Sequence, residues 1–169
     1  MTRRGLIALA MAAIAAVAAG RLNVGDELPA VGGETLSGKH IELPSAGAGA
    51  VRVLIFSFAK AAGDDSKHWS RRVEDDHAAE SYSLIFLESA PRLFRGMAVS
   101  GIKSSMPKPM WDRTVIVVKD EALWKSRLAV SEDKHAYVVM LDGTGHIRWI
   151  STAPFSEGEY AELRKALSH

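Results

Sequence analysis

The chain of 169 residues contains no cysteine. Without a thiol it can form no disulfide bond, and no side chain can supply the thiolate that thiol-disulfide exchange and thiol-based peroxide reduction require. The thiolate ligands that a copper-delivering protein would use are absent as well. The stability of the fold must therefore come from its core.

The chain also lacks an excess of charge of either sign. It has 21 Lys and Arg residues against 20 Asp and Glu residues, and without Arg3 and Arg4 the basic residues number 19. The charge that remains is about −1, whereas proteins that bind nucleic acids by their phosphates carry clusters of Lys and Arg. We therefore predict no nucleic-acid partner.

An uncharged, alanine-rich apolar run covers residues 5–19, directly after Arg3 and Arg4. A basic start, an apolar middle and small residues at positions 17–19 are typical of a secretory signal peptide. The run is shorter than the roughly 20 residues that a membrane-spanning helix prefers. We predict that residues 1–19 are a signal peptide and that the protein is exported, to the periplasm or to the outer side of the inner membrane. An uncleaved segment would tether the domain, and only in that case do we expect membrane contact.

The remaining roughly 150 residues have the usual size of one domain. Residues 20–50 are turn-rich and predict a hairpin-like N-terminal extension with a flexible link, and residues 51–169 form the main domain. Apolar and β-branched runs predict strands at residues 51–58, 83–87, 112–118, 136–141 and 146–150. Helices are expected at residues 66–81, within 88–111, at 119–128 and at 156–167. Asp64 or Asp65 can cap the first helix, and Ser156 the last.

This order of elements resembles the thioredoxin-like fold, in particular its peroxiredoxin and periplasmic TlpA branch. The resemblance is carried by three stretches, VGDELPAVGGETLSGKHIELP, VRVLIFSFAKAAGD, and VVKDEALWKSRLAV with AYVVMLDGTGHIRW. It implies an α/β protein with a thioredoxin-like central mixed sheet flanked by helices, preceded by the hairpin-like extension.

The redox site of that branch is missing from this sequence. The positions that match its Cys-x-x-Cys turn are Ala61, Ala62, Gly63 and Asp64. The cis-proline that usually precedes the penultimate strand, and presents backbone to a substrate, would lie close to His135–Ala136. The resemblance thus implies the fold without the redox activity, and we expect no enzyme, no catalytic residue and no cofactor.

A narrower resemblance is carried by FSFAKAAGDDSKHW, LESAPRLFRGMAVSGIKSSMP and DKHAYVVMLDGTGHIRW. These stretches are similar to the group that includes the thioredoxin-like assembly factor for the membrane-embedded proton-channel subunit of mitochondrial ATP synthase. The resemblance implies a chaperone without redox chemistry, whose partner is a protein such as a membrane-complex subunit.

Other chemistries find little support in the sequence. His68 and Asp65 have a spacing that could bind a metal ion, with further His and Asp residues at 64, 75, 76, 77 and 135. Such pairs are also typical of a solvated, salt-bridged helix, which we favour, and we predict no metal site. The GTG turn at residues 143–145 leads into a strand and not a helix, so it is no phosphate loop. No nucleophile-elbow motif surrounds a serine.

Residues 88–113 are basic and rich in methionine, and they contain the Met, Arg and aromatic residues that are enriched in protein interfaces. We expect Leu93, Phe94 and Met97 to face the core. The rest forms either a covering loop or a contact surface. This candidate partner surface consists of Ile102, Met106, Met110, Trp111, Arg92, Arg95, Lys103 and Lys108.

Two hypotheses of function follow. The first is an exported, redox-inactive thioredoxin-like protein that binds a protein and assists the assembly of a complex. The alternative is a small-ligand-binding protein or non-thiol enzyme that uses the former redox cleft. Its polar groups would be Lys60, Asp64, His68 and His135.

Overall fold

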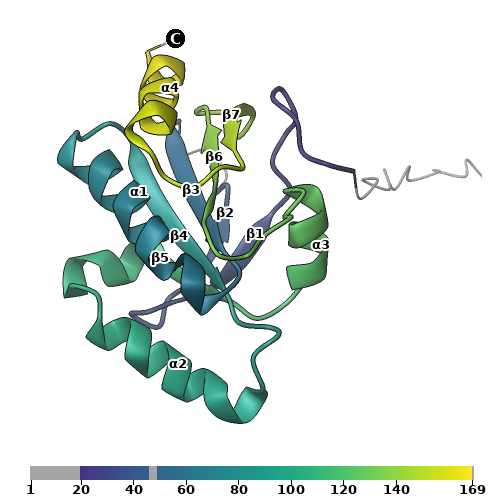
Figure 1. The fold of residues 1–169 in the computed structure, drawn as a ribbon, viewed down its shortest axis with the longest axis vertical. Coiled ribbons are helices and arrows are strands. Elements are labelled where there is room, and N and C mark those ends of the chain that lie inside the picture. Colours follow the sequence, from purple (N-terminus) through teal and green to yellow (C-terminus); the bar gives the residue numbers. More distant parts are fainter. Residues whose placement is uncertain (1–19, 46–48, 169) are drawn as a thin grey trace, which may run out of the picture.

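The computed structural model describes residues 20–45 and 49–168, so the predicted signal peptide lies outside the described residues. The described chain forms one mixed sheet in the order β2-β1-β5-β4-β3-β6-β7 (Figure 1). Its strands are β1 (Val31–Thr35), β2 (His40–Leu43), β3 (Arg52–Ser57), β4 (Glu80–Phe86), β5 (Thr114–Val117), β6 (Tyr137–Leu141) and β7 (Ile147–Ser151). The predicted α/β class and the mixed sheet are confirmed.

Strands β3, β4 and β5 are parallel, whereas β6 runs antiparallel to β3, and β7 antiparallel to β6. The predicted N-terminal hairpin forms between β1 and β2, and β1 joins the main sheet by pairing with β5. This approach needs a glycine at position 33, because a Cβ there would collide with the carbonyl oxygen of Ile116. The extension is therefore part of the central sheet.

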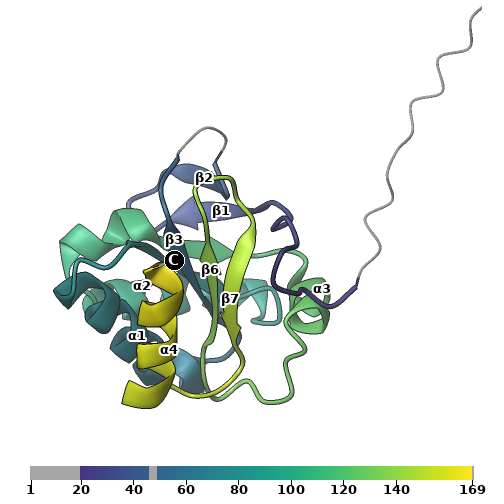
Figure 2. The ribbon, with the colours of Figure 1, turned by 90° about the horizontal axis from the view of Figure 1, so that it is seen from above.

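The two faces of the sheet are covered by different helices (Figure 2). Helices α1 (Gly63–Asp75) and α4 (Glu157–Leu167) pack on one face, with a core built around Trp69, Ile55 and Leu163. Helix α3 (Glu121–Arg127) packs on the other face, in a core that includes Phe56 and Trp124. All six residues of β3 are buried, which is why its sequence shows no alternation of polar and apolar residues.

The first helix differs from its predicted range of 66–81. A short 3₁₀ turn, Lys60–Ala62, leads directly into α1 at Gly63. The helix ends at Asp75, and His77 adopts a positive φ of 47°, which turns the chain toward β4. The N-cap prediction for Ser156 is confirmed, since its side chain accepts a hydrogen bond from the Glu159 N–H at 3.1 Å.

Helix α2 (Arg92–Ser104) and the 3₁₀ helix Lys108–Arg113 occupy the segment predicted as part helix and part loop. The prediction that Leu93, Phe94 and Met97 face the core is wrong. These side chains are 86%, 51% and 67% exposed, because this face of α2 points away from the sheet. None of the described helices is long and apolar enough to span a bilayer.

Candidate functional site

The position of the redox turn carries no reactive side chain. Ala62 is fully buried and Ala61 is exposed, and both belong to the 3₁₀ turn before α1. Gly63 opens the helix, and Asp64 points into solvent, 3.7 Å from the Lys67 ammonium. A turn of two methyl groups, a glycine and a solvated carboxylate offers no nucleophile poised for reaction.

The next residue, Asp65, closes the place where a substrate would meet the backbone. Its Oδ2 accepts a hydrogen bond from the Ala136 N–H at 2.9 Å, and its Oδ1 accepts one from the Phe155 N–H at 2.7 Å. Ala136 precedes β6, at the place where the resemblance puts the substrate-facing cis-proline. The backbone donor there is thus already bonded within the protein. The prediction that Asp64 or Asp65 caps α1 is wrong, because that helix has no side-chain cap.

None of the four polar groups of the small-ligand alternative lines either of the two hollows described below. His135 is buried, stacks on Tyr137 with a ring-centroid distance of 4.9 Å, and a ring nitrogen lies 2.9 Å from the Thr152 carbonyl oxygen. His68 is exposed and lies beside Phe155. Two hollows in the described surface have other linings, one including Arg21 and Arg127 and the other Gly32 and Trp124.

Among the described residues, those weighed as metal ligands do not form a metal-binding group. Within residues 20–45 and 49–168, no three His, Asp or Glu side chains gather as a metal site would require. Both carboxylate oxygens of Asp65 accept backbone hydrogen bonds, and Asp76 takes part in a different network.

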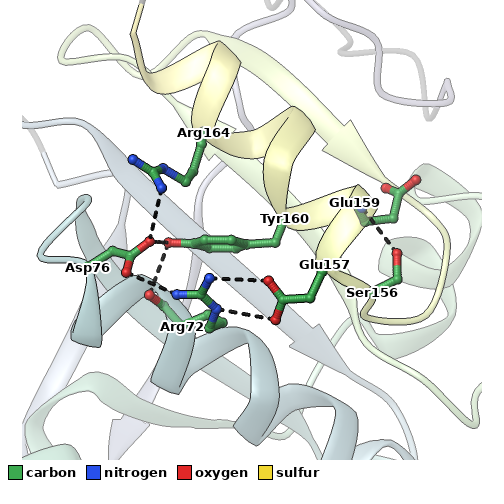
Figure 3. A network of polar contacts seen from close by, with 7 residues as sticks. All are labelled: Arg72, Asp76, Ser156, Glu157, Glu159, Tyr160 and Arg164. Carbon is green, nitrogen blue, oxygen red and sulfur yellow. Dashed lines mark hydrogen bonds and ion pairs between the residues drawn. The ribbon is translucent and has the colours of Figure 1, made fainter.

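That network joins α1 to α4 (Figure 3). The Tyr160 hydroxyl lies 2.9 Å from Asp76 Oδ2, and the Arg72 guanidinium pairs with both Asp76 and Glu157. Burial and the hydrogen bond to Asp76 raise the pKa of Tyr160 to about 12. The same bond, helped by Arg72 and Arg164, lowers the pKa of Asp76. The sequence analysis did not predict this network, although Arg72 and Asp76 have the spacing of an i,i+4 ion pair on a helix.

The apolar members of the candidate partner surface extend from the last turns of α2, which contain Ile102, to the 3₁₀ helix Lys108–Arg113 before β5. Ile102, Met106, Met110 and Trp111 are each partly buried. The Trp111 indole N–H donates to the Met106 carbonyl at 3.2 Å, and the Thr114 hydroxyl donates to the Met110 carbonyl at 2.9 Å. These bonds fix the segment, while part of each apolar side chain stays accessible.

The basic members of that surface differ in their surroundings. Lys103 lies with its ammonium 5.2 Å from the Trp111 ring centroid. Arg95 donates to the carbonyl oxygens of Ala90 and Glu88, so it anchors the start of α2. Arg92 and Lys108 are exposed. Whether this surface binds a partner stays a prediction.

Fold and site together define a thioredoxin-like protein without a thiol centre. Its fold is similar to the thioredoxin domain of a thiol-disulfide oxidoreductase from Bacteroides vulgatus, with a TM-score of 0.59 and 16% identity, covering 86% of this chain and 99% of that one. It is also similar to a peroxiredoxin-like protein from Aquifex aeolicus, with a TM-score of 0.56 and 13% identity, covering 87% and 88%. A member of the Sco family of cytochrome c oxidase assembly proteins matches with a TM-score of 0.57 and 9% identity, covering 88% and 97%.

The family is shown by the sequence. The family model described as ATP10 protein matches residues 26–169, and the chain belongs to this family. Among curated proteins, no match was found.

Proposed function

We propose that this protein is an exported, redox-inactive assembly factor that binds a subunit of a membrane complex. The observation that carries the proposal is the match of the ATP10 family over residues 26–169 of a chain without cysteine. The fold does not by itself specify a function. Because this chain has no thiol, the proposed role is to bind a partner and not to perform thiol chemistry. No specific observation favours the small-ligand alternative.

The class of partner follows from the resemblance to the assembly factor for the proton-channel subunit of ATP synthase. The Sco-family neighbour, described as one of the cytochrome c oxidase assembly proteins, supports the idea that this fold serves in assembly. The proposed partner is therefore a newly made, membrane-embedded subunit of ATP synthase.

The proposed contact is the candidate partner surface. Methionine side chains adapt to irregular partners, and the partly accessible Trp111 is of the type that dominates interface energies. The basic residues at its margin would attract an acidic segment of the partner and make association weaken with salt.

The proposed place of action is outside the cytoplasmic membrane. Its support is the signal-peptide pattern of residues 1–19. Residues 20–50 would then act as one unit with residues 51–169, and the pairing of β1 with β5 supports this joint action.

Affinity capture from solubilised membranes tests the proposal. The parent is compared with Lys108→Glu, which changes an exposed residue of the surface, and with Lys134→Glu, which changes an exposed lysine far along the chain. We expect the ATP synthase proton-channel subunit to be captured by the parent and by Lys134→Glu, and much less by Lys108→Glu. Equal capture by both variants would show that the candidate partner surface does not bind the subunit. If the parent captured no ATP synthase subunit, the proposed assembly function would be wrong.

A further inference from the structure

Helix α2 presents an apolar face to solvent. No residue of this helix is buried, and Leu93, Phe94 and Met97 are three of the large hydrophobic side chains that remain exposed in the described fold. They stand at helical spacings of three and four, so they lie on one side. A Cβ added at Gly96 or Gly101 would meet nothing within 4 Å, which agrees with an open outer side.

The opposite side of α2 holds the helix on the protein. Arg95, Ala98, Val99 and Ile102 are partly buried, and their spacing places them on one face. Arg92 and Lys103 stand 11 residues apart, close to three full turns, and so share one flank of the apolar face. The helix thus has an inner face, an outer apolar face and a basic flank.

The segment that carries this face has basic residues and no acidic ones. Residues 89–111 contain Arg92, Arg95, Lys103 and Lys108 and no Asp or Glu, in a chain that has 20 acidic residues. An exposed helix with Leu, Phe and Met on one side and basic residues beside them has the pattern of a helix that lies in a membrane interface. Its charge is complementary to anionic headgroups.

We propose that α2 binds the surface of an anionic bilayer, with Leu93, Phe94 and Met97 inserted between the headgroups and Arg92 and Lys103 contacting lipid phosphates. A bilayer fits better than a protein, because α2 projects at one end of the molecule (Figure 1) and lines neither of the two hollows noted above. A planar partner can cover a projecting helix without a matching concave surface. This contact needs no N-terminal anchor. Its inserted residues Leu93, Phe94 and Met97 are distinct from Met106, Met110 and Trp111 of the proposed protein contact, but the two surfaces share Arg92 and Lys103, and Lys103 lies beside the Trp111 ring.

The absence of cysteine makes a direct test possible. In the full chain, Met97→Cys is labelled with a polarity-sensitive fluorophore, and Ala161→Cys, an exposed position of α4 at the opposite end of the molecule, serves as the control. Both proteins are mixed with vesicles of phosphatidylcholine alone or with 30% phosphatidylglycerol, a composition of roughly physiological surface charge. Any contribution of residues 1–19 is common to the two proteins, whereas the emission shift reports the local environment of the label.

We expect a shift of the emission to shorter wavelength at position 97 with the anionic vesicles, and none at position 161. Adding Arg92→Gln and Lys103→Gln to the labelled Met97→Cys chain should weaken vesicle binding roughly thirtyfold, since each basic residue near an anionic surface contributes about a factor of five. The proposal is overturned by no shift at position 97, by equal shifts at 97 and 161, or by an equal response to neutral vesicles. Circular dichroism of each variant confirms that the fold is retained.

Discussion

At the scale of single residues, Asp65 decides what the former redox cleft can do. A thioredoxin-like protein that acts on substrates leaves backbone groups free beside its thiol, as the resemblance implies. Here the carboxylate of Asp65 accepts the N–H groups of Ala136 and Phe155, which belong to segments 71 and 90 residues further along the chain. At the former redox position, Asp65 therefore joins α1 by hydrogen bonds to the start of β6 and to the segment before α4.

Replacing Asp65 with Ala should therefore destabilise the fold. Two partly buried N–H groups would lose their acceptor, at a cost of about 2–3 kcal/mol in the free energy of unfolding. The neighbouring Asp64→Ala is the matched control, because the side chain of Asp64 is 93% exposed and its loss should change stability by less than about 0.5 kcal/mol. Urea denaturation of both variants measures the difference, and equal stabilities would refute the role of Asp65.

Tyr160 predicts how stability changes in alkali. Its pKa in the folded protein is about 12 against an ordinary value of 10.0, so the folded state holds the phenolic proton more tightly than the unfolded state. The stability that this provides is fully present below pH 10 and is lost as the pH rises toward 12, on the order of 2 kcal/mol. Tyr160→Phe has no proton to lose and should show a smaller decline across this range. Burial also raises the pKa of Tyr82, so part of the decline will remain. A variant whose stability falls as steeply as that of the parent would contradict the assignment.

At the scale of elements, the sequence predicts best where the signal is local. The apolar residues 53–56 of β3 and the Asp142–Gly143 turn of the last hairpin are sufficient to place those strands. Ser156 was identified as an N-cap because its partner lies three residues away. The bridge made by Asp65 could not be found in this way, since both of its partners are distant in sequence and are backbone groups that any residue carries.

Helix α2 shows a second limit of prediction from the sequence. Its apolar spacing predicts an amphipathic helix correctly, but the spacing alone does not say which side of the helix meets the protein. Arg95 fixes the helix by donating to the Ala90 and Glu88 carbonyls, so that Leu93, Phe94 and Met97 turn outward. An apolar stripe in a sequence therefore identifies a face that needs covering, without saying what covers it.

Leucine truncation on two helices tests this arrangement. Leu93 on α2 is 86% exposed, and Leu163 on α4 is fully buried. Leu93→Ala should change the free energy of unfolding by less than about 0.5 kcal/mol, whereas Leu163→Ala should cost about 2–5 kcal/mol through lost burial and the cavity left behind. Thermal unfolding of the two variants is sufficient. A loss of several kcal/mol in Leu93→Ala would place α2 against the core after all.

At the scale of the whole molecule, a thioredoxin-like fold is kept while its chemistry is absent. The purified protein should neither reduce insulin disulfides nor consume hydrogen peroxide in the presence of dithiothreitol, because it has no cysteine that could form a thiolate. A thioredoxin assayed in parallel is the positive control. Activity above background that survives rigorous purification would show that some other group performs the chemistry.

The central claim is that this member of the ATP10 family assists the assembly of a membrane complex. The most direct test is to measure assembled ATP synthase, by native gel electrophoresis of solubilised membranes, in cells that lack the protein. The account predicts a marked loss of the complete complex, with its subunits still synthesised, and recovery when the cysteine-free chain is restored. An undiminished amount of complete complex in the absence of the protein would contradict it.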